Sequence, residues 1–158
     1  MTTVTAAAAP SKAGAGTDRR LRIAILAIAL IGLGIAIYLT IVHYSGLKVA
    51  CLASGSCETV QSSRYAKLAG IPVPVLGLIG YIGILVTLAI RSDLGRIAGF
   101  GIALTGFLFS CYLTYRELFT IKAICQWCVG SAICMTVLTV LTAIRVMRTD
   151  LPPPAVRD

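Results

Sequence analysis

Two pairs of cysteines have the types and spacing that thiol–disulfide chemistry needs. Cys125 and Cys128 form a C-x-x-C motif, and Cys51 and Cys57 bound the segment CLASGSC. At the start of a helix, residues three positions apart share a face and lie about 4.5 Å apart along the axis. The unpaired N–H groups of that helix end stabilise a thiolate, the nucleophile of disulfide exchange. The C-x-x-C pair therefore predicts a redox dithiol, although metal sites use the same spacing.

The second pair lies in a segment rich in glycine and serine, which predicts a loop able to move. Ser56 is a suitable N-cap for a short helix from Cys57 to about Ala69, ended by Gly70. That helix would place Cys57 in a first turn and would rest its apolar side on the mouth of a helical bundle. One dithiol on a moving loop and one on a fixed helix together indicate an electron relay.

Two alternatives remain open for the four cysteines. They could form structural disulfides in a membrane scaffold without enzyme activity, or gather as a Cys₄ zinc or iron–sulfur site. A bridge that closes so few residues removes little loop entropy, so it stabilises a fold poorly. Unequal spacing and an oxidising location argue against the metal site. The relay is favoured over both.

The rest of the chain must position these pairs, and its composition indicates a membrane. Of 158 residues, 58% are hydrophobic and 13% charged, and the mean hydropathy is +0.91. A soluble domain has about 25% charged residues. Four segments are apolar enough to span a bilayer, at about 23–42, 72–90, 97–119 and 124–144. We therefore expect an all-α membrane protein, a four-transmembrane-helix bundle with an outer loop and a short interfacial helix between the first two spans.

The ends of the chain are expected to lie outside this bundle. The sequence predicts a disordered tail at residues 1–18, the membrane domain at residues 19–148 and a second tail at residues 149–158. Nine of the 14 Lys and Arg residues precede the first span, join the second to the third, or follow the fourth. The positive-inside rule then places both termini in the cytoplasm and both cysteine pairs on the outer face. The net charge of +8 is explained by topology and contact with the lipid bilayer, so no nucleic-acid partner is expected.

A dithiol relay also needs an electron acceptor. No haem or flavin signature is present, so we expect a lipid-soluble quinone, bound in the outer half of the bundle beside Cys128. Tyr112 and Trp127 are aromatic candidates for contact with it. Cys111 and Cys134 fall within spans and are interpreted as small buried hydrophobes. Glu117 is interpreted as half of an interfacial ion pair with Arg116.

Several stretches resemble one known family in order and spacing. They are GIAIYLTIVHY at 34–44, the C-x₅-C loop, CETVQSS at 57–63, the helix start at Gly77, SCYLTY at 110–115, and CQWC at 125–128. In these stretches the chain resembles the vitamin K epoxide reductase family in its bacterial form, over about residues 20–147. The order of the two cysteine pairs is specific to this family: the loop dithiol comes first and the C-x-x-C pair last.

The resemblance implies roles for individual residues. Cys128 would face the quinone, Cys125 would exchange with Cys57, and Cys51 would be the sulfur that the reduced partner meets first. Ser63 matches a serine that the family uses near the quinone and the active cysteines.

The resemblance also implies a reaction, partners and a location. The acceptor would be menaquinone or ubiquinone, without a metal cofactor. The chain ends without the fused thioredoxin-like domain of many members, so we expect a separate thioredoxin-fold dithiol protein as partner. The expected location is the bacterial inner membrane. Animal members have a tyrosine where this chain has Ala132, and an asparagine where it has Val73 or Pro74. Contacts to the quinone head group are therefore expected to differ. The expected function is quinone-linked thiol oxidation that supports disulfide formation.

Overall fold

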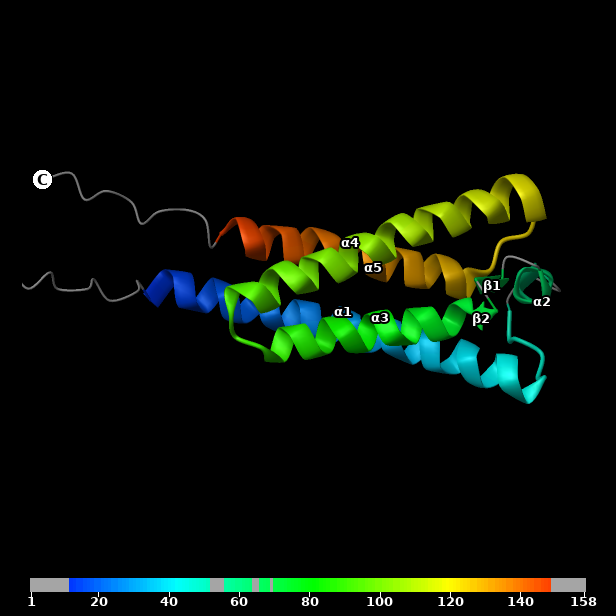
Figure 1. Cartoon of the computed structure of the whole chain (residues 1–158), viewed down its shortest axis with the longest axis horizontal. Coiled ribbons are helices and arrows are strands. Elements are labelled where there is room, and N and C mark those ends of the chain that lie inside the picture. Colours follow the sequence, from blue (N-terminus) through cyan, green and yellow to red (C-terminus); the bar gives the residue numbers. More distant parts are fainter. Residues whose placement is uncertain (1–11, 52–55, 64–65, 69, 149–158) are drawn as a thin grey trace, which may run out of the picture.

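Four long helices make up most of the protein in a computed structural model that describes residues 12–51, 56–63, 66–68 and 70–148 (Figure 1). The long helices are α1 (Lys12–Ser45), α3 (Val73–Ala89), α4 (Asp93–Arg116) and α5 (Gln126–Met147). Between α1 and α3 lie a short helix, α2 (Ser56–Ser62), and two short strands, β1 (Lys67–Leu68) and β2 (Ile71–Pro72). A single π-helical turn, η2 (Glu117–Ile121), continues α4.

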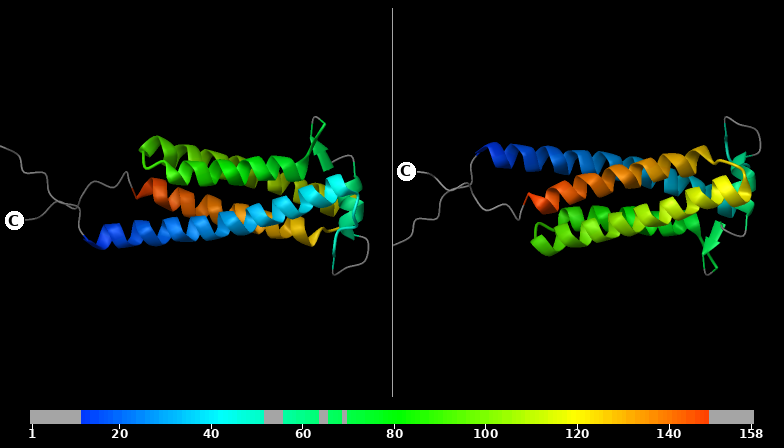
Figure 2. Two further views of the ribbon diagram at one scale, coloured as in Figure 1. Left: turned by 90° about the horizontal axis from the view of Figure 1, so that it is seen from below. Right: turned by 90° about the horizontal axis from the view of Figure 1, so that it is seen from above.

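The long helices run side by side along one axis, as two further views show (Figure 2). α1 packs on α3 and α5, and α4 packs on the same two helices. Their shared core contains Ile25, Ala29, Ala36, Tyr81, Ile84, Leu88, Ala103, Cys134, Met135 and Leu138. The buried positions of α4 are Gly95, Gly99 and Ala103, small residues that allow close approach between helices.

Local sequence signals set where the helices begin. Pro72 is the N-cap of α3, and Pro74 lies in the first turn, where its missing N–H costs no hydrogen bond. The Ser92 side chain caps α4 by accepting a hydrogen bond from the Gly95 N–H at 3.1 Å.

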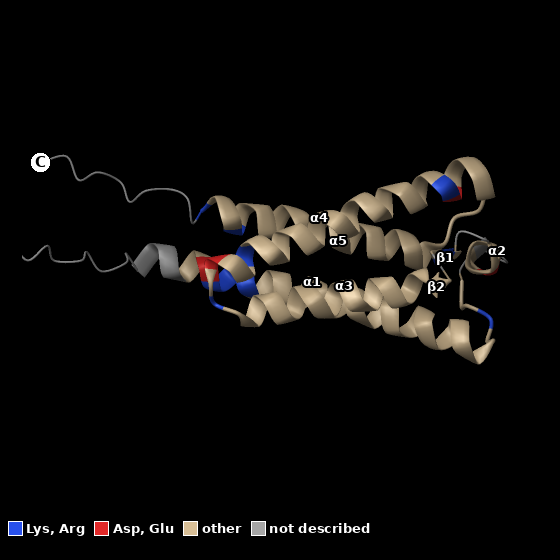
Figure 3. Ribbon diagram, viewed as in Figure 1, with Lys and Arg blue, Asp and Glu red and all other residues tan. Residues whose placement is uncertain are grey.

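Within the part of the chain that the structure describes, three helical segments are long and apolar enough to cross a membrane, namely Gly16–Ser45, Asp93–Ile121 and Gln126–Met147. α3 is apolar throughout but has 17 residues, fewer than the other three. Charged residues in the described part of the chain lie near the two ends of the bundle and leave its middle clear (Figure 3). The protein is therefore helical and membrane-embedded, and the fourth span stays a prediction.

The loop after α1 differs from the sequence expectation. The short helix ends at Ser62 instead of about Ala69, because the next residues form a hairpin in which Leu68 pairs with Ile71. Gly70 turns this hairpin with a φ of +86°, a left-handed conformation that glycine adopts without strain. The prediction that Gly70 ends a helix was therefore wrong. Glycine is common both at helix ends and in hairpin turns, so its presence did not distinguish the two. The segment 52–55, which the sequence predicts to be a flexible loop, lies outside the described residues.

Helix α1 extends into the segment that the sequence predicts to be a disordered tail. Helix α1 begins at Lys12, so residues 12–18 are helical instead of disordered. Asp18 helps to hold this end, because its carboxylate pairs with the largely buried Arg145 of α5 at 3.4 Å. Residues 1–11 and 149–158 lie outside the described residues.

Candidate active site

The loop cysteines form a disulfide next to the C-x-x-C pair. Cys51 and Cys57 are bonded, with their Cα atoms 6.3 Å apart. Cys57 is in the first turn of α2 and is 2% exposed. It packs with Val60 and Cys125 in a buried cluster that Cys51 and Cys128 also contact. The fold thus brings both pairs into one apolar cluster, although 68 positions separate Cys57 from Cys125 in sequence.

The C-x-x-C pair occupies the N-terminus of α5. Cys125 is the N-cap residue and is fully buried, while Cys128 lies in the first turn and is partly buried. Both are free thiols, and a hydrogen bond from the Cys128 thiol lowers the pKa of Cys125 against the opposing effect of burial. This is the electrostatic arrangement of a reactive dithiol at a helix start.

Ala50, the residue before Cys51, is held by hydrogen bonds on both sides of its backbone. Its N–H donates to the Tyr38 hydroxyl at 3.0 Å, and its carbonyl accepts from the Trp127 indole at 2.8 Å. The rings of Tyr38 and Trp127 contact each other, with centroids 4.8 Å apart. Since Trp127 lies within the C-x-x-C motif, these bonds tie the loop cysteines to the fixed pair.

Glu117 lies beneath the C-x-x-C pair. Its side chain is buried, with the residue 5% exposed, and its carboxylate accepts a hydrogen bond from the Cys125 N–H at 3.2 Å. It also contacts the Cys128 thiol. The π turn of η2 and the left-handed Lys122, at a φ of 55°, fold the chain back so that residues eight positions apart meet.

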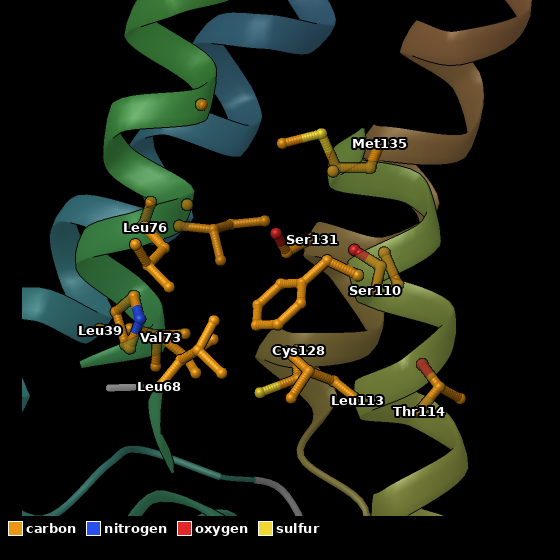
Figure 4. Close-up of a pocket in the computed structure, with 18 of the residues that line it drawn as sticks. Leu39, Leu68, Val73, Leu76, Ser110, Leu113, Thr114, Cys128, Ser131 and Met135 are labelled. Carbon is orange, nitrogen blue, oxygen red and sulfur yellow. The ribbon is translucent and has the colours of Figure 1, made fainter. Parts of the chain in front are cut away.

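A cavity of about 700 Å³ opens beside Cys128. All four long helices line it, together with the loop between α1 and α3. The Cys128 side chain points from α5 toward this space, across from Leu68 and Val73 (Figure 4). The lining is mostly apolar; its polar and charged members are Gln61, Ser63, Thr105, Ser110, Thr114, Arg116, Glu117, Cys128 and Ser131. A pocket of this size and lining can hold a small, mostly apolar molecule.

The other residues singled out in the sequence lie at different distances from the cavity. Ser63 lines it and donates to the Val60 carbonyl at 2.7 Å, whereas its neighbour Ser62 is exposed. Tyr112 and Trp127 are not among the described residues that line the cavity. Tyr112 is half exposed on α4, where its hydroxyl accepts from Arg116 at 3.3 Å.

The two remaining cysteines lie away from the cluster. Cys134 is buried in the helical core, as expected of a small hydrophobe. Cys111 is exposed on α4, so the interpretation of it as buried was wrong. Cys111 therefore lies on the outer surface of the helical bundle.

Sequence reasoning missed the position of Glu117. The expected interfacial ion pair does not describe a side chain buried against Cys125 and Cys128. One signal was available, because Glu117 is the only acidic residue between Asp93 and Asp150. A lone carboxyl group in a long apolar stretch is a candidate functional group.

The described residues contain no group of three or more His, Cys, Asp or Glu side chains placed to hold a metal ion. Two cysteine pairs beside an apolar cavity in a membrane bundle define a membrane thiol oxidoreductase. The family model described as the vitamin K epoxide reductase family matches residues 23–143. The chain belongs to this family, whose members are quinone-linked thiol oxidoreductases of membranes.

Proposed function

We propose that this protein passes two electrons from a separate thioredoxin-fold dithiol partner to membrane quinone, and so supports disulfide formation. The observation that carries the proposal is the single buried cluster of Cys57 and Cys125, with Cys128 opening from it onto the apolar cavity. The path then runs from the partner to Cys51–Cys57, on to Cys125–Cys128, and to quinone.

The first step exchanges the partner's thiols for the loop disulfide. A partner thiolate attacks Cys51 and releases Cys57 as a thiolate; the partner's second thiol then closes its own disulfide and frees Cys51. The partner is oxidised and the loop pair is reduced by the same two electrons. Thiolate attack on an accessible sulfur is the chemistry of each such step.

The second step moves the electrons inward. Cys57 attacks Cys125 of the Cys125–Cys128 disulfide and releases Cys128; Cys51 then attacks Cys57, which re-forms the loop disulfide and frees Cys125. The product of this step has a loop disulfide and two C-x-x-C thiols. That is the pattern of bonded and free cysteines described above.

The third step reduces the quinone. The electron pair leaves through Cys128, Cys125 closes the disulfide with it, and two protons and two electrons convert quinone to quinol. The apolar lining and volume of the cavity fit a quinone ring, and Ser63 supplies a hydroxyl at its edge.

The proposal includes an arrangement in the bacterial inner membrane. With α3 as the fourth span, both termini face the cytoplasm and the cysteine pairs face the outer side. The excess of Lys and Arg at the opposite end of the bundle supports this orientation. An oxidising compartment on that side is where disulfides persist.

The test is quinone reduction by purified protein supplied with a reduced thioredoxin-fold protein. Cys128→Ser is expected to abolish quinol formation, because it removes the sulfur that opens onto the cavity. Cys111→Ser is the matched control, since Cys111 is exposed away from the cluster, and it should turn over at the parent rate. Normal quinol formation by Cys128→Ser would refute the path. No turnover in the parent, with a loop disulfide stable to mild reductant, would favour the scaffold instead.

A further inference from the structure

We propose that Glu117 is the proton carrier of the quinone-reducing step, accepting the thiol protons and delivering them to the quinone. The inference rests on the function proposed above. It concerns a different question, since the cysteine path accounts for the electrons and leaves the protons without a carrier.

Glu117 touches both parts of the reaction. It contacts the Cys128 thiol, accepts a hydrogen bond from the Cys125 N–H at 3.2 Å, and lines the cavity. At 5% exposure Glu117 is screened from bulk water, and Cys125 beside it is fully buried. A carboxylate within hydrogen-bond reach of the reacting thiol is the geometry that general acid–base catalysis requires.

The other groups around the cavity are poor candidates for this role. Among its described lining residues Glu117 is the only carboxyl group, and Arg116 stays protonated in proteins. The partners of the Glu117 carboxylate are Cys125 and Cys128 at the start of α5. Arg116, at the end of α4, lines the same cavity, and Cys57 of α2, which packs on η2, is held in its disulfide. Glu117 is thus the group beside the reacting sulfurs that can both take up and release a proton.

The protons and electrons balance without a further reactant. Glu117 accepts the Cys128 proton as the sulfur gives its electron pair to the quinone, and passes that proton to one quinone oxygen. When Cys125 bonds to Cys128, the Cys125 proton follows the same route to the second oxygen. Two thiols become one disulfide, quinone becomes quinol, and Glu117 ends as it began.

A purely structural role for Glu117 predicts a different result. If the carboxylate only held the Cys125 N–H, glutamine would keep an oxygen acceptor of nearly the same shape. Glu117→Gln would then lower the rate little and equally at every pH. A proton carrier needs the ionised carboxylate, so the parent rate should rise with pH on the acid side, and the glutamine variant should lack that rise.

The experiment mixes pre-reduced protein with a short-chain quinone over a range of pH and follows quinol formation in a single turnover. Glu117→Gln is expected to be about 100-fold slower or more, the usual share of acid–base catalysis. Thiol exchange between the reduced partner and the loop disulfide, followed by maleimide labelling without quinone, should proceed at the parent rate. Glu58→Gln is the matched control, because Glu58 is an exposed acid at the same end of the bundle.

Each outcome decides the question. Parent-like quinol formation by Glu117→Gln, or a uniform loss without change in pH profile, would overturn the role of Glu117 and leave the cysteine path standing. A parent that exchanges thiols but reduces no quinone would remove the proposed function and this inference with it. If Glu117→Gln fails to fold, Glu117→Asp replaces it, and the rise with pH should persist at a lower rate.

Discussion

The hydrogen bonds that hold Ala50 should control how firmly the loop cysteines rest on the C-x-x-C pair. Trp127→Phe keeps an aromatic ring against Tyr38 and removes only the indole donor to the Ala50 carbonyl, a bond of 2.8 Å. Tyr38→Phe removes the hydroxyl that accepts the Ala50 N–H at 3.0 Å. Both changes spare the cysteines, so they test the attachment of the loop alone.

The size of the effect follows from the bonds removed. A typical hydrogen bond contributes about 0.5–1.5 kcal/mol net, which corresponds to about a 2- to 13-fold change in the opening equilibrium of the loop. Because the Tyr38 and Trp127 rings contact each other and bond the same residue, the effects of the two substitutions should depart from additivity in the double variant. Amide hydrogen exchange in a peptide covering residues 47–51 should therefore speed up by that factor in Trp127→Phe.

The control is Tyr44→Phe, since Tyr44 is a neighbouring tyrosine on α1 that is 70% exposed. Exchange in that variant should match the parent. Unchanged exchange in both Trp127→Phe and Tyr38→Phe would refute the idea that these two side chains hold the loop. Electron transfer from the reduced loop pair to the C-x-x-C disulfide can be measured by rapid quenching with maleimide. It should be slowest in the variant whose amide hydrogen exchange is fastest.

Two further predictions concern packing and the C-x-x-C thiols. Gly32→Ala should lower the free energy of unfolding in detergent by about 1–3 kcal/mol, the usual cost of overpacking, because a Cβ there would overlap the buried Tyr81 ring; Gly34→Ala, with open space around it, should not. Cys128→Ala should raise the pKa of Cys125, because it removes the hydrogen bond that lowers that pKa and leaves the opposing burial in place. Ultraviolet thiolate absorbance against pH, with Cys125→Ser as baseline, measures this, and an unchanged titration would contradict the assigned hydrogen bond.

The long helices and the C-x-x-C position were predictable because their signals are local. Apolar runs mark α1, α4 and α5, and Pro72 and Pro74 mark the start of α3. The end of α2 was not predictable, since glycine at position 70 is equally suited to a helix end and a hairpin turn.

The contacts that complete the site come from positions far apart in the chain. Trp127 bonds to a carbonyl 77 positions earlier, and no pattern within either segment indicates that contact. Glu117 was visible as a lone acid, but its orientation depends on a π turn, which is rare and has no clear sequence signal. Local propensity could therefore predict which elements carry the cysteines. It could not predict the contacts that Trp127 and Glu117 make around them.

The turn between α4 and α5 brings Glu117 to Cys125. The length of the connecting segment 118–124 is therefore as important as its composition. The Glu117 carbonyl accepts the Ala123 N–H at 3.2 Å, while the Glu117 carboxylate accepts the Cys125 N–H at the same distance. Removing one residue from 118–124 would shift the start of α5 relative to α4, and the Cys125 N–H would no longer meet the Glu117 carboxylate. Related sequences that share this site should therefore accept many substitutions across these seven positions and no insertion or deletion.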